Sequence, residues 1–358
     1  MAKFSEVLTI VNGRNQKQVV CDDGKYPIYG SGGIMGYAND YICKAETVVI
    51  GRKGSINKPI FVETPFWNVD TAFGLCANSE KLNPKYLYYF CEKFDFEKLN
   101  TTVTIPSLTK SNLLNVEIPL PNLEKQKQIV ELLDKITSLI SLRKQQLAKL
   151  DELVKAQFAN TFENDANFHT DYMENLSEFV TVGIANSATH AYAEHGVVML
   201  RNQNIKENHL DDTELVYIEP KFTDKYKSKK LEANDILVTR TGYPGIACVV
   251  PQKYAGSQTF TTLIIRLKKG TNASSCYICH YINSSHGKKY VSGTKVGVAQ
   301  QNFGAKVLAK MPVIVPPIEL QNQFATFVAR IDQQKQTVQQ SLEKLELMKK
   351  ALMQEYFG

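Results

Sequence analysis

No stretch of the sequence approaches the roughly 20 consecutive apolar residues that a membrane-spanning helix needs. Residues 1–20 also lack the long apolar core of a secretory signal peptide. The seven cysteines are odd in number and irregularly scattered, which is typical of reduced thiols rather than of a disulfide framework. The sequence therefore predicts a cytoplasmic protein with no membrane association.

Catalytic patterns are equally scarce. The six histidines form no HExxH motif or comparable metal-binding cluster, and no Ser-His-Asp arrangement is recognisable from its spacing. No Gly-rich cofactor loop of the Rossmann type is present, and the Gly30–Gly33 turn, which contains Ser31, is only a weak phosphate-binding signal. We therefore predict no catalytic residue, no metal site and no cofactor in this chain.

The chain does contain an internal repeat. Ile118–Phe162 and Val313–Phe357 each begin with a proline-bounded apolar strand and continue into a long polar-rich helix. Upstream, Thr47–Ser55 matches Asp235–Tyr243, and Gly24–Gly33 corresponds loosely to Glu194–Gln203. These matches place Pro121, Glu124, Gln126 and Gln128 on Pro316, Glu319, Gln321 and Gln323, Arg52 on Arg240, and Gly54 on Gly242.

Both repeated helices carry an apolar stripe in steps of three and four residues, which is typical of a coiled coil. Arg143 interrupts the first stripe and Lys335 the second. Pairing the two stripes in an antiparallel coiled coil is the simplest way to bury them, the alternative being that each helix packs on its own domain. The stripes are Ile129, Leu133, Ile136, Ile140, Leu147, Leu150 and Val154, and Phe324, Val328, Ile331, Val338, Leu342 and Leu345.

The remaining segments predict mixed α/β domains, with short strands such as Glu46–Gly51, Asn234–Thr239 and Phe260–Leu267 and a helix that begins at Asn83-Pro84. A chain of 358 residues accommodates two domains of about 130–150 residues. The predicted fold class is α+β: two mixed α/β domains joined by two long antiparallel coiled-coil helices, with a pseudo-twofold internal repeat. The predicted segments are domain 1 (1–120), the central helix (121–162), domain 2 (163–315) and the C-terminal helix (316–358).

Two short motifs resemble catalytic or cofactor sites. Asn83–Tyr86 is similar to the Asn-Pro-Pro-Tyr loop of amino-methyltransferases, but a helix N-cap followed by proline gives the same letters. Cys276–His280 matches the attachment pattern of c-type haem, but the corresponding helix of the first half carries Lys85 and Tyr88 near the cysteine positions. We interpret both motifs as parts of packed helices.

Binding chemistry is better represented than catalysis. Net charge +6 and a pI near 8.7 are compatible with a polyanionic partner. Turns beside the predicted strands combine basic, hydroxyl, amide and aromatic side chains, which can contact phosphates or base edges. The candidate DNA-binding residues are Lys25, Tyr29, Ser31, Arg52, Lys53, Ser55 and Lys110 in the first half, and Arg201, Asn202, Gln203, Arg240, Thr241, Tyr243, Gln300 and Gln301 in the second.

The order of these segments, given twice, resembles the specificity (S) subunits of type I restriction-modification systems over essentially the whole chain. The resemblance is carried first by the segments that begin the two long helices, Ile118–Val130 and Val313–Ala325. It is also carried by the segments with the two Arg-Xaa-Gly turns, Glu46–Ser55 and Asp235–Gly242. Three further stretches add to it: Pro65–Phe73, Thr104–Lys110 and Val298–Gly304.

The resemblance implies a non-catalytic subunit with two target-recognition domains, each reading one half of a bipartite asymmetric site on double-stranded DNA. It implies that the helices set the gap between the half-sites. It also implies assembly with two methyltransferase (M) subunits and optionally with motor-nuclease (R) subunits, which would carry S-adenosylmethionine, ATP and Mg²⁺. Because the two halves diverge outside the shared motifs, we expect their half-sites to differ.

Three alternative interpretations remain open at this point. The first is a specificity subunit or solitary recognition half of a related fused methylase-nuclease system, which co-purifying partners would reveal. The second is a coiled-coil scaffold, which predicts no salt-dependent DNA affinity. The third is an enzyme that acts alone on nucleic acid, which the missing cofactor loop disfavours.

Overall fold

The computed structural model describes residues 1–100, 107–163, 168–184, 191–294 and 303–358. They form two compact units: unit 1 comprises Met1–Gln146 and Thr337–Gly358, and unit 2 comprises Leu147–Gln336. Each long helix therefore contributes one part to each unit. The sequence-based division, which makes each helix a segment of its own, stays a prediction.

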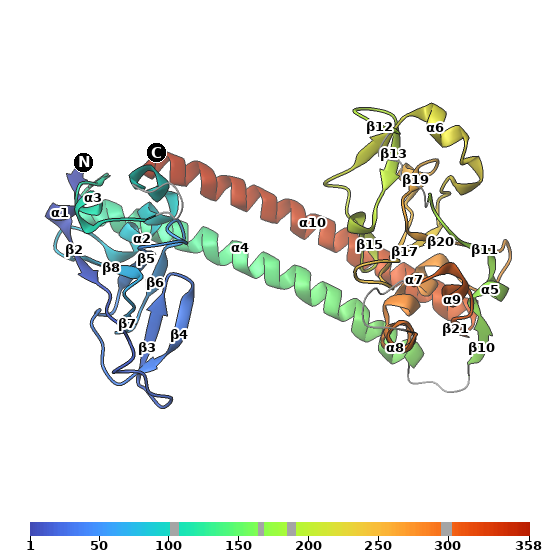
Figure 1. Ribbon diagram of the computed structural model, residues 1–358, viewed down its shortest axis with the longest axis horizontal. Coiled ribbons are helices and arrows are strands. Elements are labelled where there is room, and N and C mark those ends of the chain that lie inside the picture. Colours follow the sequence, from blue (N-terminus) through green and yellow to red (C-terminus); the bar gives the residue numbers. More distant parts are fainter. Residues whose placement is uncertain (101–106, 164–167, 185–190, 295–302) are drawn as a thin grey trace. The chain divides into compact units, whose positions relative to one another are not determined.

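Unit 1 is built on an antiparallel four-stranded sheet of order β2-β8-β5-β6, joined by the sheet β4-β3-β7 and the pair β1-β9 (Figure 1). Alternating apolar residues of the four-stranded sheet pack against α2 in one core. The elements are β1 (Ala2–Lys3), α1 (Phe4–Val7), β2 (Leu8–Asn12), β3 (Tyr26–Gly30), β4 (Gly33–Ala38), β5 (Thr47–Gly51), β6 (Ile60–Val62), β7 (Trp67–Asn68), β8 (Ala72–Ala77), α2 (Pro84–Lys93), α3 (Lys110–Leu114), β9 (Glu117–Ile118) and the first part of α4 (Leu123–Phe158).

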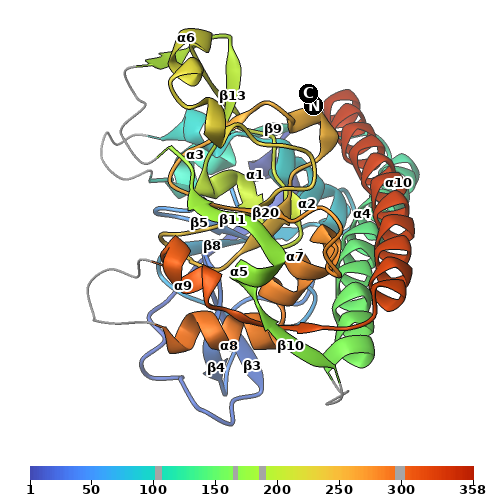
Figure 2. The same ribbon diagram turned by 90° about the vertical axis from the view of Figure 1, so that its right-hand side faces the viewer.

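Unit 2 repeats this plan with the sheet β11-β20-β17-β18 and the pair β10-β21, and Figure 2 shows β11 and β20 side by side with α5 next to β11. A second four-stranded sheet, β12-β16-β13-β19, and the hairpin β14-β15 complete it. The elements are β10 (His169–Tyr172), α5 (Met173–Leu176), β11 (Ser177–Val182), β12 (Tyr192–Ala193), β13 (Val197–Leu200), β14 (Ile205–Lys206), β15 (His209–Leu210), β16 (Val216–Ile218), α6 (Pro220–Asp224), β17 (Ile236–Val238), β18 (Ala247–Val249), β19 (Gln258–Thr259), β20 (Leu263–Leu267), α7 (Ser275–Asn283), α8 (Ser285–Gly293), α9 (Ala305–Ala309), β21 (Pro312–Val315) and part of α10 (Ile318–Phe357).

Strand register supports the upstream repeat. Val48 of β5 lies opposite Leu75 of β8, and Ile236 of β17 lies opposite Ile265 of β20. This register agrees with the match of Thr47–Ser55 to Asp235–Tyr243.

The looser sequence match, of Gly24–Gly33 to Glu194–Gln203, is displaced by one residue in the structure. In the parallel pairs β3·β7 and β13·β19, the carbonyls of Tyr29 and Leu200 accept equivalent hydrogen bonds, from Val69 N (3.0 Å) and Phe260 N (2.8 Å). The strand pairing therefore aligns Tyr29 with Leu200, whereas the sequence match aligns Tyr29 with Met199. Residue similarity in these divergent strands is too low to fix the register, which the parallel partner strand determines.

A buried glutamine in both units joins the start of the long helix to the loop that precedes the domain helix, α2 in unit 1 and α7 in unit 2. Gln126 is fully buried in α4; its Oε1 accepts from Asn83 N (2.8 Å), and its Nε2 donates to Lys81 O (3.0 Å) and Pro121 O (2.8 Å). Gln321 of α10, equally buried, makes the equivalent three hydrogen bonds with Ser274 N, Asn272 O and Pro316 O. Each side chain thus satisfies backbone groups that burial would otherwise leave unpaired. This duplicated contact explains why glutamine recurs at the start of both helices.

The long helices α4 and α10, of 36 and 40 residues, are confirmed together with their apolar stripes. Every residue of the two predicted stripes is buried or half-buried, and so are the interrupting Arg143 and Lys335. At 1.5 Å per residue these helices are about 54 and 60 Å long.

The helices run antiparallel within each unit. In unit 1, the start of α4 shares a core with Phe357 at the end of α10, while Lys144 farther along α4 pairs with Glu346 at 2.9 Å. In unit 2, the ring of Phe158 lies 5.4 Å from that of Phe324, while the earlier Asp151 pairs with Lys335 at 2.6 Å. The predicted α+β fold class with two antiparallel coiled-coil helices and an internal repeat is confirmed.

Candidate nucleic-acid interface

In unit 1, several candidate residues lie around the loop that follows β5. Arg52, Lys53, Gly54 and Ser55 are all exposed, and Gly54 has a left-handed φ of +77° that favours glycine. The loop is held by Arg52 N, which donates to Thr71 O (2.8 Å), and by Arg52 O, which accepts from Leu108 N (2.9 Å). The predicted exposed basic turn is therefore present on a fixed backbone.

Two further candidate segments meet this loop. Lys53 forms an isolated β-bridge with Ser107, and Ser31 lies against the end of β5, because a Cβ on Gly51 would be 3.0 Å from the Ser31 Cβ. The structure thus brings Ser31, Arg52 and Lys53 together with the segment that precedes α3.

The other candidates of unit 1 have contacts inside the protein. Lys25 is exposed at the start of β3, with its ammonium 5.6 Å from the ring of Tyr26. The ring of Tyr29 packs edge-on against Phe66, and Lys110 Nζ donates to Ile10 O (2.9 Å). These contacts give Tyr29 and Lys110 structural roles, and DNA contact by the three residues stays a prediction.

The corresponding loop of unit 2 follows β17. Gly242 has φ +75°, nearly the value of Gly54, and Arg240 O accepts from Phe303 N (3.2 Å) as Arg52 O does from Leu108. The hydroxyl of Thr239 fixes the turn, since it donates to Tyr243 O (2.7 Å) and accepts from Ile246 N (2.9 Å). Tyr243 is 85% exposed at the tip. The same turn therefore occurs in both units with different side chains.

The Arg201–Gln203 segment lies against this loop. Asn202 Nδ2 donates to Thr241 Oγ1 (2.8 Å), which joins two segments that the sequence identified separately. Arg201 and Gln203 both contact Glu214, through its carbonyl (3.0 Å) and its carboxylate (3.3 Å). Within the described part of the chain, Asn202 Oδ1 and Arg201 Nε are buried without a hydrogen-bond partner. Contacts inside the described protein therefore satisfy this polar cluster only in part. Gln300 and Gln301 lie outside the described residues.

Sequence reasoning missed one segment with the same chemistry. Residues 14–18, Arg-Asn-Gln-Lys-Gln, follow β2, and all except Gln16 are exposed. Arg14 N donates to Asn68 O (2.8 Å), and Trp67 Nε1 donates to Arg14 O (3.0 Å). The loop is therefore fixed beside β7. Its run of basic and amide residues next to a strand is the criterion that selected the other loops.

The two motifs that resemble catalytic or cofactor sites are structural. Asn83 caps α2, accepting from Lys85 N (2.9 Å) and Tyr86 N (3.0 Å). Cys276–His280 lies on α7 in the core of unit 2, where burial raises the pKa of Cys276 to about 11 and lowers that of His280 to about 4. Among the residues that the structure describes, no group of three His, Cys, Asp or Glu side chains is placed to hold a metal ion.

A duplicated α+β frame with a polar and partly basic turn repeated in each half, and with paired long helices, is the arrangement expected of a DNA-recognition subunit with two binding regions. The family comparison agrees. A model described as type I restriction modification DNA specificity domain matches residues 1–152 and 169–347, and the chain belongs to this family.

Curated relatives support the assignment, and solved structures share the fold. The chain is similar to the type I restriction enzyme MjaVIII specificity subunit of Methanocaldococcus jannaschii, with 22% identity over 86% of this chain and 75% of the relative. Its fold matches that of a type I S subunit from M. genitalium, with a TM-score of 0.64 and 14% identity over 100% and 95% of the two chains. It also matches a chain from a study of complex assembly and conformational transition in a type I R-M system, with a TM-score of 0.61 and 13% identity over 99% and 96%.

The chain is therefore a specificity subunit of a type I restriction-modification system, with a role in DNA sequence recognition, and it is a non-catalytic component of that system. Across the described ranges, none of the helices has the length and apolarity required to cross a membrane.

Proposed function

We propose that each unit reads one half of a bipartite, asymmetric site on double-stranded DNA and that α4 and α10 set the length of the unread gap. The observation that carries this proposal is the loop that recurs after β5 and after β17. In both places an arginine and a left-handed glycine stand at the end of the same strand in the same sheet order. Two equivalent readers in one chain are what a two-part site requires.

The side chains of the two loops favour different half-sites. Lys53 and Ser55 in the first loop correspond to Thr241 and Tyr243 in the second. Arginine can bind guanine O6 and N7, and asparagine can bind adenine N6 and N7. The hydrogen bond from Asn202 to Thr241 places these two polar side chains side by side in unit 2.

The outer faces of the helices are proposed to dock two methyltransferase subunits, and optionally motor-nuclease subunits. Leu132, Leu139 and Leu142 of α4 are exposed, and their spacing of seven and three residues puts them on one side of the helix. An exposed apolar row of this kind is typical of a protein-protein contact. S-adenosylmethionine, ATP and Mg²⁺ then belong to those partners in the cytoplasm, and this chain brings only its position on DNA.

Mapping of adenine methylation tests the proposal. DNA from cells that carry this chain with its neighbouring methyltransferase subunit is compared with DNA from cells that lack only this chain. We expect a split, asymmetric methylated motif that depends on the chain. Absence of the motif, together with absence of salt-dependent DNA binding by the purified chain, would contradict the proposal and favour a coiled-coil scaffold.

A further inference from the structure

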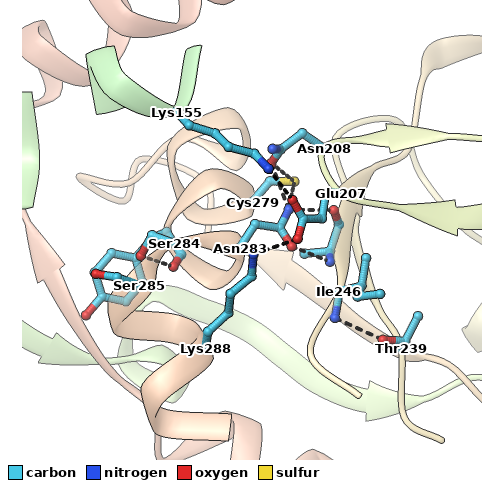
Figure 3. Close-up of polar contacts among 12 residues, drawn as sticks. Lys155, Glu207, Asn208, Thr239, Ile246, Cys279, Asn283, Ser284, Ser285 and Lys288 are labelled. Carbon is cyan, nitrogen blue, oxygen red and sulfur yellow. Dashed lines mark hydrogen bonds and ion pairs between the residues drawn. The ribbon is translucent and has the colours of Figure 1, made fainter. Parts of the chain in front are cut away.

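The β14-β15 hairpin of unit 2 lies between the end of α4 and the helices α7 and α8 (Figure 3). Its turn contains Glu207 and Asn208, and Asn208 has a left-handed φ of +64°. Asparagine adopts this backbone conformation more readily than other residues with a side chain, which suits it to a tight hairpin turn.

Glu207 links two helices through one carboxylate. Its Oε2 lies 2.9 Å from Lys155 Nζ of α4, and its Oε1 lies 2.6 Å from Lys288 Nζ of α8. Partial burial acts to raise the pKa of Glu207, but the hydrogen bonds from Lys288 and Lys155 outweigh it and hold the pKa below its usual value. Glu207 is therefore charged at neutral pH and attracts both lysines.

Asn208 connects the hairpin turn to α7 and to β18. Its Oδ1 accepts from Asn283 Nδ2 (2.7 Å), and its N donates to Ala247 O (2.9 Å). Asn283, which is 7% exposed, also holds the backbone of β18, accepting from Ala247 N (2.9 Å) and donating to Ala247 O (2.8 Å). The turn is thus joined to β18 by side-chain and backbone hydrogen bonds.

Ile246, the residue directly before β18, contacts the loop that follows β17. Ile246 N donates to Thr239 Oγ1, and that hydroxyl donates to Tyr243 O. The polar contacts drawn in Figure 3, together with the peptide links from Glu207 to Asn208 and from Ala247 to Ile246, connect Lys155 on α4 to the loop that carries Arg240 and Tyr243.

Unit 1 joins the corresponding elements differently. Asn283 near the end of α7 corresponds to Glu92 of α2, which pairs with Lys349 of α10 at 3.1 Å. The helix there is tied directly to the spacer helix, without an intervening hairpin turn in the contact. The Glu207-Asn208 connection is a feature of the second reader.

We propose that Glu207 and Asn208 are positioning residues that hold the Arg240–Tyr243 loop at a fixed place on α4 and so set the distance between the second half-site and the first. The inference rests on the proposed two-part reading of DNA. These residues touch no base; they act through the loop that does. Loosening them lets the second reader accept neighbouring registers without changing the bases it prefers.

Two variants test this inference. Glu207→Gln keeps the side-chain shape and removes the charge, and Asn208→Gly keeps the left-handed φ and removes the amide. The matched control is Glu174→Gln, because Glu174 forms the same kind of contact with Lys310 (2.6 Å) in unit 2 but does not contact α4. Each variant replaces the wild-type chain in the methylation mapping, and amide hydrogen exchange is measured on the purified proteins.

For Glu207→Gln and Asn208→Gly we expect unchanged half-site sequences, methylation at gaps one base pair shorter or longer than the wild-type gap, and faster exchange of the Ile246 amide. In Glu207→Gln the preference for the wild-type gap should fall by about fivefold, the scale of two partly exposed ion pairs. In Asn208→Gly it should fall because the hydrogen bond with Asn283 is lost. The control should retain the wild-type gap and exchange rate.

A wild-type motif with an equally strict gap in both variants overturns the inference and leaves the proposed function standing. Equal broadening in Glu174→Gln overturns it as well, because any surface ion pair would then have the same effect. A wild-type chain that yields no split motif overturns the proposed function and this inference with it.

Discussion

At the scale of single residues, buried amides hold each long helix to its domain. Gln126 and Gln321 each accept one backbone hydrogen bond and donate two others in a fully buried setting. Removing such a side chain leaves several backbone groups without partners, and each unpaired buried group costs about 1–3 kcal/mol. Gln126 and Gln321 therefore have a structural role.

We expect Gln126→Met to lower the free energy of unfolding of unit 1 by about 3 kcal/mol, because methionine fills the space but satisfies none of the three backbone groups. Chemical denaturation followed by circular dichroism measures the change. The control is Gln128→Met on the exposed side of the same helix, which should stay within about 0.5 kcal/mol of wild type. Equal stabilities of the two variants would contradict this role.

His280 is a second residue whose burial has a consequence for stability, in this case for its dependence on pH. It is 7% exposed, with its ring centroid 5.0 Å from that of Phe324 and 6.1 Å from that of Phe158. Burial, reinforced by the charge of Lys335, lowers its pKa from the usual 6.5 to about 4. The folded protein therefore holds this imidazole neutral over a range where the unfolded chain protonates it.

A depressed folded-state pKa contributes stability above the unfolded pKa, and this contribution is lost as pH falls through the folded value. For His280 the loss falls between pH 6.5 and about 4 and amounts to about 2 kcal/mol between pH 7 and pH 5. We expect His280→Phe to remove most of this dependence in urea titrations at the two pH values. His195→Gln, at an exposed position, serves as the control. An unchanged pH dependence in His280→Phe would refute the assignment.

Arg240 tests whether the two readers act independently. Arg240→Ala should relax the base preference in one half-site and leave the other intact, at a cost of about 1–3 kcal/mol if the guanidinium contacts a base. Arg52→Ala is the reciprocal variant and should affect the opposite half-site. The measurement is methylation mapping with each variant. Loss of preference in both halves from a single variant would count against independent readers.

At the scale of elements, α4 presents two different faces. Its apolar stripe packs within the units, whereas Leu132, Leu139 and Leu142 remain exposed on another side. An exposed apolar row on a helix marks a candidate surface for a protein partner. The proposed partner is the methyltransferase subunit.

We expect Leu139→Glu combined with Leu142→Glu to weaken binding of the methyltransferase subunit by about tenfold or more, since a charge in an apolar contact is costly to bury. Co-sedimentation of the purified subunits measures the binding. Ser141→Glu, compared with each single leucine variant, adds one negative charge on a different side of the helix and should bind normally. The double variant should still bind DNA. If the double variant binds the methyltransferase subunit normally, the contact with that subunit lies elsewhere on the chain.

The elements that the sequence predicts correctly are those with local or repeated signals. The helical stripes, the N-cap at Asn83 and the Arg-Xaa-Gly turns all depend on residues close together in the chain. Contacts between distant segments could not be predicted in this way. Lys110, for example, carries the composition of a DNA-binding residue, but its ammonium donates to Ile10 O, a partner 100 residues away.

The same limit applies to the candidate interface. Asn202 and Thr241 were identified as members of separate loops, and only the fold brings them into hydrogen-bond contact. The link between Glu207, Lys155 and Lys288 likewise joins three distant segments. By contrast, the Arg14–Gln18 loop satisfies the sequence criterion and could have been selected from composition alone.

At the scale of the whole molecule, the repeat assigns one set of reading loops and one part of each long helix to each unit. Under the proposed function, a protein divided in this way can change its base preference and its spacing independently. Variation in the loops after β5 and β17 would alter the base preference. Variation in helix length would alter the spacing, because a helix extends by 1.5 Å per residue.

Insertion of one heptad into α4 between Leu133 and Val154, with a second heptad in α10 between Val338 and Leu345, tests this separation. A heptad preserves the apolar stripe and adds about 10 Å, the length of about three base pairs. We expect methylation mapping to return both original half-sites with a gap longer by about three base pairs. If a half-site changes in sequence, the helices contribute to base reading and do not act as a spacer alone. An unchanged gap would mean that spacing is fixed by the partner subunits.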